Sequence, residues 1–393
     1  MNTLRRGLFT LCLLALLGGC GPVSDPGAET DVSSGRAGFA DLGAASQGYP
    51  DASPATELHF PADHGPHPDF RIEWWYLTAN LENEDGEPLG MQWTLFRQAQ
   101  QPKAADASAA AEPWVADQLW MAHMALSRGE SHRVAERFAR GASEPVLNTA
   151  QQAGVTARPF RAWLDDWRLE SLTTTPGGDA LNHLMLTAQA EDESGPFGYQ
   201  LELEADGPLV RHGINGFSQK SADGQGSMYY SQPFYRVNGK VWLNGERVAV
   251  SGRAWLDREW SSQLLSDNQT GWDWFSLHLD SGARLMAFRL RGGGENHGDY
   301  LSGSWITPDG EVTPLNTGAL TLVPQAFASA SGHRMPVRWR LTLPEQNLEL
   351  EIAARHANRW MNTSVPYWEG AVSVTDARSG ASRGQGYLEM TGY

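Results

Sequence analysis

Two carboxylic acids stand two residues apart beside a tryptophan in the segment 252–260, and no other pattern in the chain offers chemistry as directly. Because side chains alternate between the two faces of a β-strand, Trp255, Asp257 and Glu259 share one face. Two nearby carboxyl groups push each other's pKa values apart, so one of them can hold a proton near neutral pH. Such an acid beside an indole could protonate an alkene, a ketone or a glycosidic oxygen. The alternative is an ion pair with a neighbouring arginine.

A second dense group of polar and aromatic side chains lies in the segment 60–76. By the same alternation, Arg71, Glu73 and Trp75 share one strand face. Glu73 could line a binding site as a further acid, or it could be the counter-ion of Arg71 or Arg97. The ion pair is the favoured interpretation.

The same segment holds two histidines near two acids, which raises the question of a metal site. His64 and His67 are separated by Gly-Pro and flanked by Asp63 and Asp69. The prolines exclude a helix, so the helical two-histidine zinc arrangement is absent. We expect a buried, hydrogen-bonded loop and no metal.

His123 lies on an apolar strand and is expected to be a core histidine. No dinucleotide fingerprint or nucleophile elbow occurs, and no cofactor is expected.

The first twenty residues have the layout of a bacterial lipoprotein signal. Two arginines precede the short apolar run Leu8–Leu17, and small residues precede Cys20. We expect cleavage after residue 19 and acylation of Cys20, which would anchor the chain to a membrane without spanning it. An ordinary secretory peptide is the alternative. Pro22, where inner-membrane retention would favour Asp, indicates the outer membrane of the envelope, with the protein on its periplasmic face.

Charge and composition narrow the partners. Loss of residues 1–19 would lower the 30 Lys and Arg to 28 against 46 Asp and Glu, a net charge of −18. This balance argues against nucleic acid as a partner. Cys12 and Cys20 are the only cysteines, so the mature fold contains no disulfide. Sixteen tryptophans favour an apolar or stacking cavity, although Trp is also a good core residue.

The remaining pattern predicts an all-β fold. Residues 20–56 are rich in small and polar types and read as a flexible tether, and residues 98–113 read as a long loop. Short alternating strands are separated by turn signals, of which Asn244-Gly245 is the clearest hairpin. Only Ser131–Ala142 is a modest helix candidate.

The chain also repeats itself. The hairpin from Trp75 to Arg97 has a counterpart from Trp274 to Arg289, and a Trp-Arg-Leu strand follows in each half. We therefore predict two related β-domains, over residues 57–237 and 238–393. The alternative is chance similarity between hairpins.

A set of collinear segments makes the chain resemble the AttH-like proteins, often labelled predicted secreted hydrolases, which are grouped with the carotenoid 1,2-hydratases (CrtC, hydroxyneurosporene synthase-like). These segments are Phe60–Tyr76, Ala122–Ala125, Gly213–Ser218, Tyr229–Ser231, Gly252–Ser261, Gly271–Trp274, Tyr367–Gly370 and Gly386–Tyr393. The resemblance implies two tandem lipocalin-like β-barrel domains. It also implies that Asp257 matches the proposed proton donor of the hydratases, whereas Trp255 and Leu256 replace that branch's Tyr and His.

These features together predict a lipid-anchored protein that binds an apolar small molecule of lipid or terpenoid type, with hydratase-, isomerase- or hydrolase-like acid catalysis as an open question. Asp257 would be the acid and Glu259 would tune it. The residues expected to contact the ligand are Trp75, Tyr230, Trp255, Trp272 and Glu73. One alternative is a binding protein without chemistry that serves an envelope export permease. A carbohydrate binder or glycosidase ranks last, because carboxyl groups two residues apart lie too close for that reaction.

Overall fold

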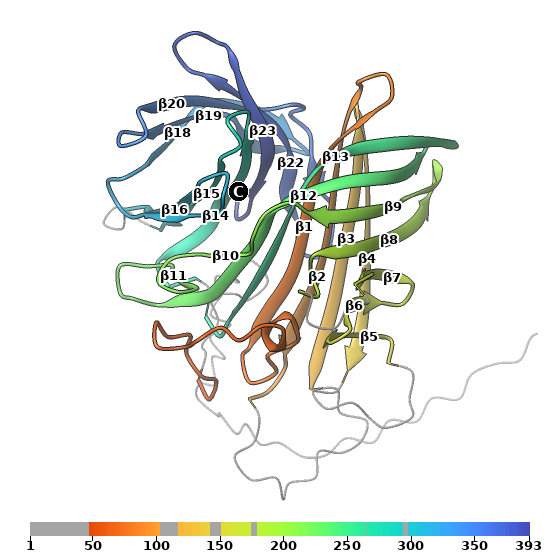
Figure 1. The fold of residues 1–393 in the computed structure, drawn as a ribbon, viewed down its shortest axis with the longest axis horizontal. Helices are drawn as coiled ribbons and strands as arrows, with labels where there is room; N and C mark the ends of the chain where they lie inside the picture. Colours follow the sequence, from red (N-terminus) through yellow and green to blue (C-terminus); the bar gives the residue numbers. More distant parts are fainter. Residues whose placement is uncertain (1–46, 103–116, 142–150, 174–178, 264, 294–297) are drawn as a thin grey trace, which may run out of the picture. The chain divides into compact units, whose positions relative to one another are not determined.

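The computed structural model describes residues 47–102, 117–141, 151–173, 179–263, 265–293 and 298–393 (Figure 1). The expected signal peptide and Cys20 lie outside these residues, as does most of the expected tether. The described residues all belong to one compact unit. Within the described ranges the chain is almost entirely β, with one short 3₁₀ helix, η2 (Ala62–His64). No helix in those ranges is long and apolar enough to cross a membrane.

The first sheet runs in the order β4-β3-β2-β1-β13-β12-β9-β8-β7-β6-β5, and β10 and β11 also pair with β12. Its strands are β1 (Ile72–Asn83), β2 (Pro88–Ala99), β3 (Gln118–Arg128), β4 (Ser131–Gly141), β5 (Ala153–Ala157), β6 (Phe160–Leu164), β7 (Trp167–Ser171), β8 (His183–Asp192), β9 (Gly195–Ala205), β10 (Val210–Arg211), β11 (Phe217–Gln219), β12 (Gly226–Leu243) and β13 (Glu246–Ser261).

The second sheet runs in the order β17-β16-β15-β14-β23-β22-β20-β19-β18, with β21 paired to β22. Its strands are β14 (Gln269–Leu279), β15 (Arg284–Gly292), β16 (Tyr300–Ile306), β17 (Val312–Leu315), β18 (Thr321–Ala330), β19 (His333–Leu343), β20 (Leu348–Ala354), β21 (Trp360–Met361), β22 (Tyr367–Asp376) and β23 (Ser382–Met390). The paired strands of both sheets run antiparallel.

Each sheet curls around its own apolar core as a barrel or half-barrel, so the predicted all-β fold of two lipocalin-like barrels is confirmed. Trp93 and Trp167 lie in the first core, and Trp339 and Trp368 lie in the second. Burial of large indoles on the inner face of each sheet supplies much of the apolar area that drives folding.

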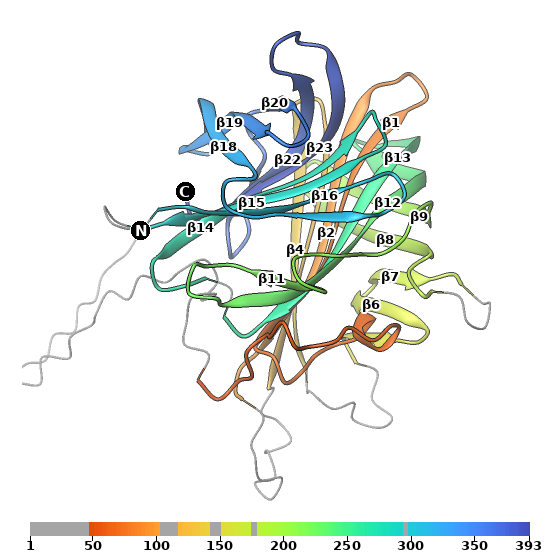
Figure 2. The ribbon, with the colours of Figure 1, turned by 60° about the vertical axis from the view of Figure 1, so that its left-hand side comes forward.

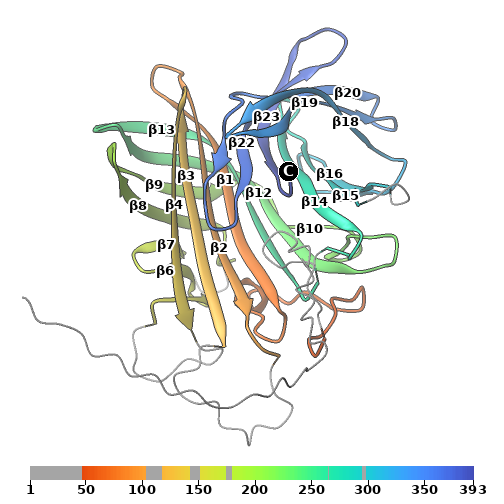
Figure 3. The ribbon, with the colours of Figure 1, turned by 180° about the vertical axis from the view of Figure 1, so that it is seen from behind.

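A third apolar cluster lies between the two sheets and positions the candidate site. It joins Tyr76, Tyr229 and Trp255 of the first sheet to Trp274 and Phe288 of the second. Strand β1 lies against β23, and Figure 3 shows β22 and β23 beside β1. Strands β1, β12 and β13 are therefore buried on both faces over much of their length, with one face in the first barrel and the other against the second sheet.

Local turn chemistry agrees with the sequence at the clearest hairpin. Asn244 and Gly245 join β12 to β13 with φ values of 56° and 81°, the left-handed region in which Asn and Gly are favoured. The helix considered for Ser131–Ala142 is wrong, because residues 131–141 form the edge strand β4. Its residues pair with β3 in continuous antiparallel register, and that pairing outweighs a weak local helical pattern.

The two halves meet at a different point from the one expected. The boundary at residues 237 and 238 falls inside β12, and the chain leaves the first sheet only after Ser261. In both sheets the first hairpin, β1–β2 or β14–β15, lies beside the last long strand, β13 or β23, as a repeat requires. The Trp-Arg-Leu strand is the fourth strand after β13 in the first sheet, where it is β7. It is the third strand after β23 in the second sheet, where it is β19, so the two halves differ by one strand at this point.

Candidate active site between the two sheets

A cavity opens between the outer faces of the two barrels (Figure 2 shows β14, β15 and β16 passing beside β12). The first sheet contributes Trp74, Tyr76, Phe96, His123, Asp257 and Glu259, the second contributes Trp272, Trp274, Phe288, Tyr367 and Glu389, and the segment after β11 contributes Lys220. Aromatic rings thus form a large part of the wall, and several carboxyl groups contribute to its polar part.

Asp257 is 2% exposed and accepts three hydrogen bonds. The Ser231 hydroxyl and the Trp255 indole N–H donate to Oδ1, the latter at 2.6 Å, and the Tyr229 hydroxyl donates to Oδ2 at 2.7 Å. Ser231 is the register partner of Asp257 in the β12–β13 ladder, while Tyr229 stands two residues earlier on the same face of β12. The site around Asp257 is therefore built by strand register alone.

Burial raises the pKa of Asp257 to about 7, although its three hydrogen-bond donors act in the opposite direction and Glu259 adds a like charge. Removal from water penalises the ionised form more than the neutral one, and here that penalty exceeds the stabilisation from the donors. Near neutral pH, Asp257 is thus poised to give or take a proton.

Two further acids come from the second sheet. Glu369 and Glu389 are directly paired across β22 and β23, and the indole N–H of Trp272 donates to Glu389 at 2.6 Å. Burial raises the pKa of Glu389 to about 7, and the charges of Asp257 and Glu259 act in the same direction. Burial and the neighbouring Glu389 raise the pKa of Glu369 well above its usual value.

Glu259, the fourth acid, is matched by a cation. The Lys220 ammonium lies 2.8 Å from Glu259 Oε1, and the Ser227 hydroxyl donates to the same oxygen. Lys220 also lies over the rings of Tyr229 and Phe288, with its Nζ 4.9 Å and 4.3 Å from their centroids. This ion pair partly offsets the negative charge of the cavity.

The residues predicted from sequence occupy three different places. Asp257, Glu259, Trp272 and Glu73 line the cavity. Trp255 lies between the sheets and reaches the site through its bond to Asp257. Trp75 and Tyr230 belong to the apolar core of the first barrel, on the opposite face of their strands.

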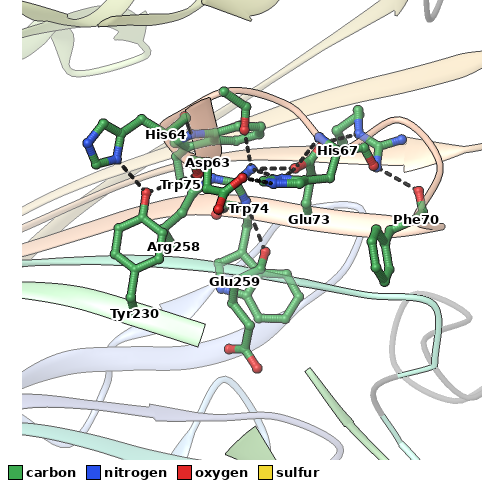
Figure 4. A network of polar contacts seen from close by, with 12 residues as sticks. Asp63, His64, His67, Phe70, Glu73, Trp74, Trp75, Tyr230, Arg258 and Glu259 are labelled. Atoms are coloured by element: carbon green, nitrogen blue, oxygen red, sulfur yellow. Dashed lines mark hydrogen bonds and ion pairs between the residues drawn. The ribbon is translucent and has the colours of Figure 1, made fainter. Parts of the chain in front are cut away.

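Glu73 is the centre of a buried ion network at one end of the first barrel (Figure 4). It binds the guanidinium groups of Arg97 and Arg258, and these charges hold its pKa well below the usual range. His67 stacks on Trp260 with centroids 3.8 Å apart and donates its backbone N–H to Glu73. The favoured ion pair of Glu73 and Arg97 is confirmed.

The histidine loop closes over this network. His64 is fully buried, with Nδ1 2.8 Å from the Tyr230 hydroxyl, and its carbonyl accepts the Trp75 indole N–H at 3.0 Å. Figure 4 shows Tyr230 pointing toward His64, whereas the side chain of Glu259 points away from the network. The expected buried, hydrogen-bonded loop is confirmed.

Both the sequence and the architecture of this chain have counterparts among known proteins. The AttH-like family model matches residues 51–393. The chain belongs to the AttH-like family. A crystal structure described as an AttH protein from Nitrosomonas europaea is 33% identical, covers 88% of this chain and 99% of its own, and superposes with a TM-score of 0.72.

More distant structures share the AttH-like fold. Kievitone hydratase from Nectria haematococca is 14% identical, covers 87% of this chain and 95% of its own, and has a TM-score of 0.59. The structure of CghA with Sch210972 is 12% identical, covers 88% of this chain and 97% of its own, and has a TM-score of 0.50. A search of curated proteins returned no match.

Several site residues of this AttH-like chain were not singled out from sequence. Glu369 and Glu389 each follow a tyrosine by two residues, which places acid and ring on one strand face, just as Trp255 and Asp257 are placed. This two-residue spacing between a tyrosine and an acid is the sequence signal that could have identified Glu369 and Glu389. Tyr229, not its neighbour Tyr230, contacts Asp257, because only every second residue of β12 faces the second sheet.

Metal-ligand geometry within the described residues occurs away from this cavity. His183, Glu202 and Glu204 on β8 and β9 bring three ligand atoms within 4.8 Å of one another. The two glutamates are exposed, and Glu202 already pairs with His183 at 2.6 Å. Surface acids of this kind pair readily without an ion, so the group adds nothing to the chemistry of the cavity.

Proposed function

We propose that the cavity between the two barrels binds an apolar small molecule and that Asp257 protonates it in a hydratase-type reaction. The observation that carries this proposal is a buried carboxyl group with its pKa raised to about 7, set in an aromatic cavity. Kievitone hydratase has the same fold, but at this identity the likeness extends to the fold alone. The reaction type therefore rests on the chemistry of the site.

Addition of water to a double bond needs an acid and a base, and the cavity holds a candidate for each. Protonated Asp257 would give its proton to one carbon, leaving a carbocation at the other. Ionised Glu389 would accept a proton from the water that attacks that cation. Because nearby like charges disfavour double ionisation, a state with one proton shared between the two acids is favoured near neutral pH.

The cavity wall defines the substrate class. Trp74, Trp272, Trp274 and Phe288 present ring faces and edges that favour a lipid- or terpenoid-like skeleton and stabilise a developing cation. Ionised Glu389 adds negative potential that favours the same cation. Isomerisation begins with the same proton transfer and ends with loss of a proton instead of attack by water. Hydrolysis would protonate a leaving group instead of a carbon.

We also propose that the chain is a lipoprotein on the periplasmic face of the outer membrane, anchored through Cys20. The apolar run before Cys20 supports this placement. Incorporation of labelled palmitate into the wild type and its loss in Cys20→Ser, together with release of that variant from membranes, is the expected result. Palmitate label in Cys20→Ser would contradict it.

The catalytic proposal is tested by first identifying the ligand. Native mass spectrometry and solvent extraction of the purified protein should yield an apolar molecule. That molecule or its unsaturated analogues are then incubated with enzyme in water labelled with ¹⁸O, which reports hydration. Asp257→Asn should keep the ligand but lose label incorporation by a factor of about 100 or more, as should Glu389→Gln. Asp223→Asn, an exposed change, is the control.

Three outcomes separate the alternatives. Unchanged turnover in Asp257→Asn overturns the acid role. A ligand that is retained but never converted by the wild type would indicate a binding protein without chemistry, for example one that passes its ligand to an export permease. A sugar in place of an apolar molecule would overturn the proposed substrate class.

A further inference from the structure

A buried histidine outside the cavity is linked to the acid through a serine. His212 is fully buried, with Nε2 2.7 Å from Ser231 Oγ and Nδ1 2.9 Å from Ser304 Oγ. Ser231 is also bonded to Oδ1 of Asp257. The result is a continuous chain from β13 through β12 to β16 of the second sheet, Asp257–Ser231–His212–Ser304, none of whose last three members lines the cavity.

The other two partners of Asp257 act as donors in this arrangement. The Trp255 indole N–H is a donor without acceptor capacity. The Tyr229 hydroxyl receives the Trp274 indole N–H at 3.1 Å, so its own hydrogen is directed to Asp257 Oδ2. Both donors suit an ionised Asp257. The indole cannot accept a hydrogen bond from the protonated acid, and Tyr229 could accept one only by turning its own hydrogen away from Asp257.

The chain through Ser231 can run in either direction. With ionised Asp257, Ser231 donates to the carboxylate, His212 Nε2–H donates to Ser231, and Ser304 donates to Nδ1. With a proton on Oδ1, Asp257 donates to Ser231, Ser231 donates to Nε2, and His212 Nδ1–H donates to Ser304. The two arrangements differ by the one proton that Asp257 releases to solvent or substrate, and the other three protons are retained and reordered.

We propose that His212 changes tautomer when Asp257 changes charge, so that the Ser231–His212–Ser304 chain satisfies this acid in both of its protonation states. A buried hydroxyl without an acceptor is costly, and this chain supplies the acceptor that the protonated acid needs. His212 is thus a positioning residue that acts through Ser231. The inference deepens the proposed function, because Asp257 is the acid of that reaction.

The surroundings keep His212 neutral throughout. Its ring packs on Tyr229 with centroids 4.2 Å apart, and burial, assisted by the charge of Lys220, lowers its pKa to about 3. Besides its three donors, Asp257 faces the like charges of Glu259 and Glu389. Because the imidazole stays neutral over the pH range in which Asp257 titrates, it can respond only by carrying its proton on the other ring nitrogen.

Nitrogen-15 NMR of histidine-labelled protein tests this without a substrate. Between about pH 5 and pH 9, the His212 signals should pass from the Nδ1–H to the Nε2–H pattern as pH rises, with the midpoint of the Asp257 carboxyl signal. In Ser231→Ala the His212 pattern should no longer follow pH. Ser227→Ala is the same change four residues earlier on β12, beside Glu259, and it should leave the pH response of His212 in place.

The outcomes separate this inference from the proposed function. A single His212 tautomer across the titration of Asp257, or a doubly protonated imidazole, overturns the inference. A response that survives in Ser231→Ala does the same. If the tautomer follows Asp257 but Asp257→Asn turns over normally, the linkage stands and the catalytic proposal fails.

Discussion

The hydroxyl of Tyr76 on β1 donates a hydrogen bond to Oε1 of Glu369 on β22 at 2.6 Å, from one barrel to the other. Tyr76 is also the register partner of Asp257 on β13. One tyrosine therefore fixes the acids of the second sheet relative to the acid of the first. The relationship makes the cavity a joint product of both barrels.

Replacement of Tyr76 by Phe removes this bond and leaves a buried carboxyl group short of a donor. We expect a loss of about 1–3 kcal/mol in the free energy of unfolding, the usual cost of an unsatisfied buried polar group. The pKa of Glu389 should also rise, because the Tyr76 hydroxyl lowers it in the wild type. Urea denaturation measures the first effect. Wild-type stability in Tyr76→Phe would show that the bond contributes nothing across the barrels.

Replacement of Glu73 by Gln removes the carboxylate that pairs with two buried guanidinium groups. Arg97 and Arg258 are 2% and 1% exposed, so we expect a loss of about 3–5 kcal/mol in the free energy of unfolding. The control is Glu246→Gln, which breaks an exposed pair with Arg128 and should cost less than about 1 kcal/mol. Similar losses in both variants would show that burial of the network is unimportant.

Stability should depend on pH in opposite directions in two windows. Asp257 and Glu389 have pKa values raised to about 7, so the native state binds more protons than the unfolded chain above about pH 4. Each therefore lowers stability as pH rises toward 7, by up to about 1.4 kcal/mol per pH unit. Glu73 has a lowered pKa, so its contribution is lost as pH falls below about 4.5.

Chemical denaturation at pH 5 and pH 8 isolates the upper window. Relative to the wild type, Asp257→Asn and Glu389→Gln should be more stable at pH 8 than at pH 5, because each removes one destabilising titration. The curve of Asp223→Asn should run parallel to that of the wild type. Parallel curves for all three variants would mean that neither buried acid titrates in this range.

Alternation along strands was enough to predict which side chains share a face. It placed Trp255, Asp257 and Glu259 together, and it separated Trp75 from Trp74 and Tyr76, as the structure shows. It could not show which face meets the second barrel. Both faces of β1, β12 and β13 are apolar and buried, so a one-residue choice put Tyr230 at the site in place of Tyr229.

Local sequence patterns could not predict which residues from distant parts of the chain meet at the site. Glu389 follows Asp257 by more than a hundred residues, and their strands meet through contacts between the two sheets, such as that of β1 with β23. The helix considered at β4 failed for a related reason, because an edge strand takes its conformation from its neighbour. The hairpin turns, whose signals are local, were predicted correctly.

Lys220 offsets negative charge in the cavity, and its removal should raise the pKa values of Asp257 and Glu389. The charge of Glu259 raises the pKa of Asp257 and of Glu389, and Lys220 at 2.8 Å offsets part of that charge. In Lys220→Met, the carboxyl midpoint of Asp257 in a carbon-13 NMR titration should therefore move upward by about one pH unit.

Two matched variants decide whether charge is the cause. Lys220→Arg keeps the cation and should restore a midpoint near that of the wild type. Lys240→Met removes an exposed lysine of β12 that does not line the cavity, and it should leave the midpoint in place. An unchanged midpoint in Lys220→Met would mean that Lys220 serves packing against Tyr229 and Phe288 alone. A shift shared by Lys220→Arg would assign the effect to the position of the ammonium and not to its charge.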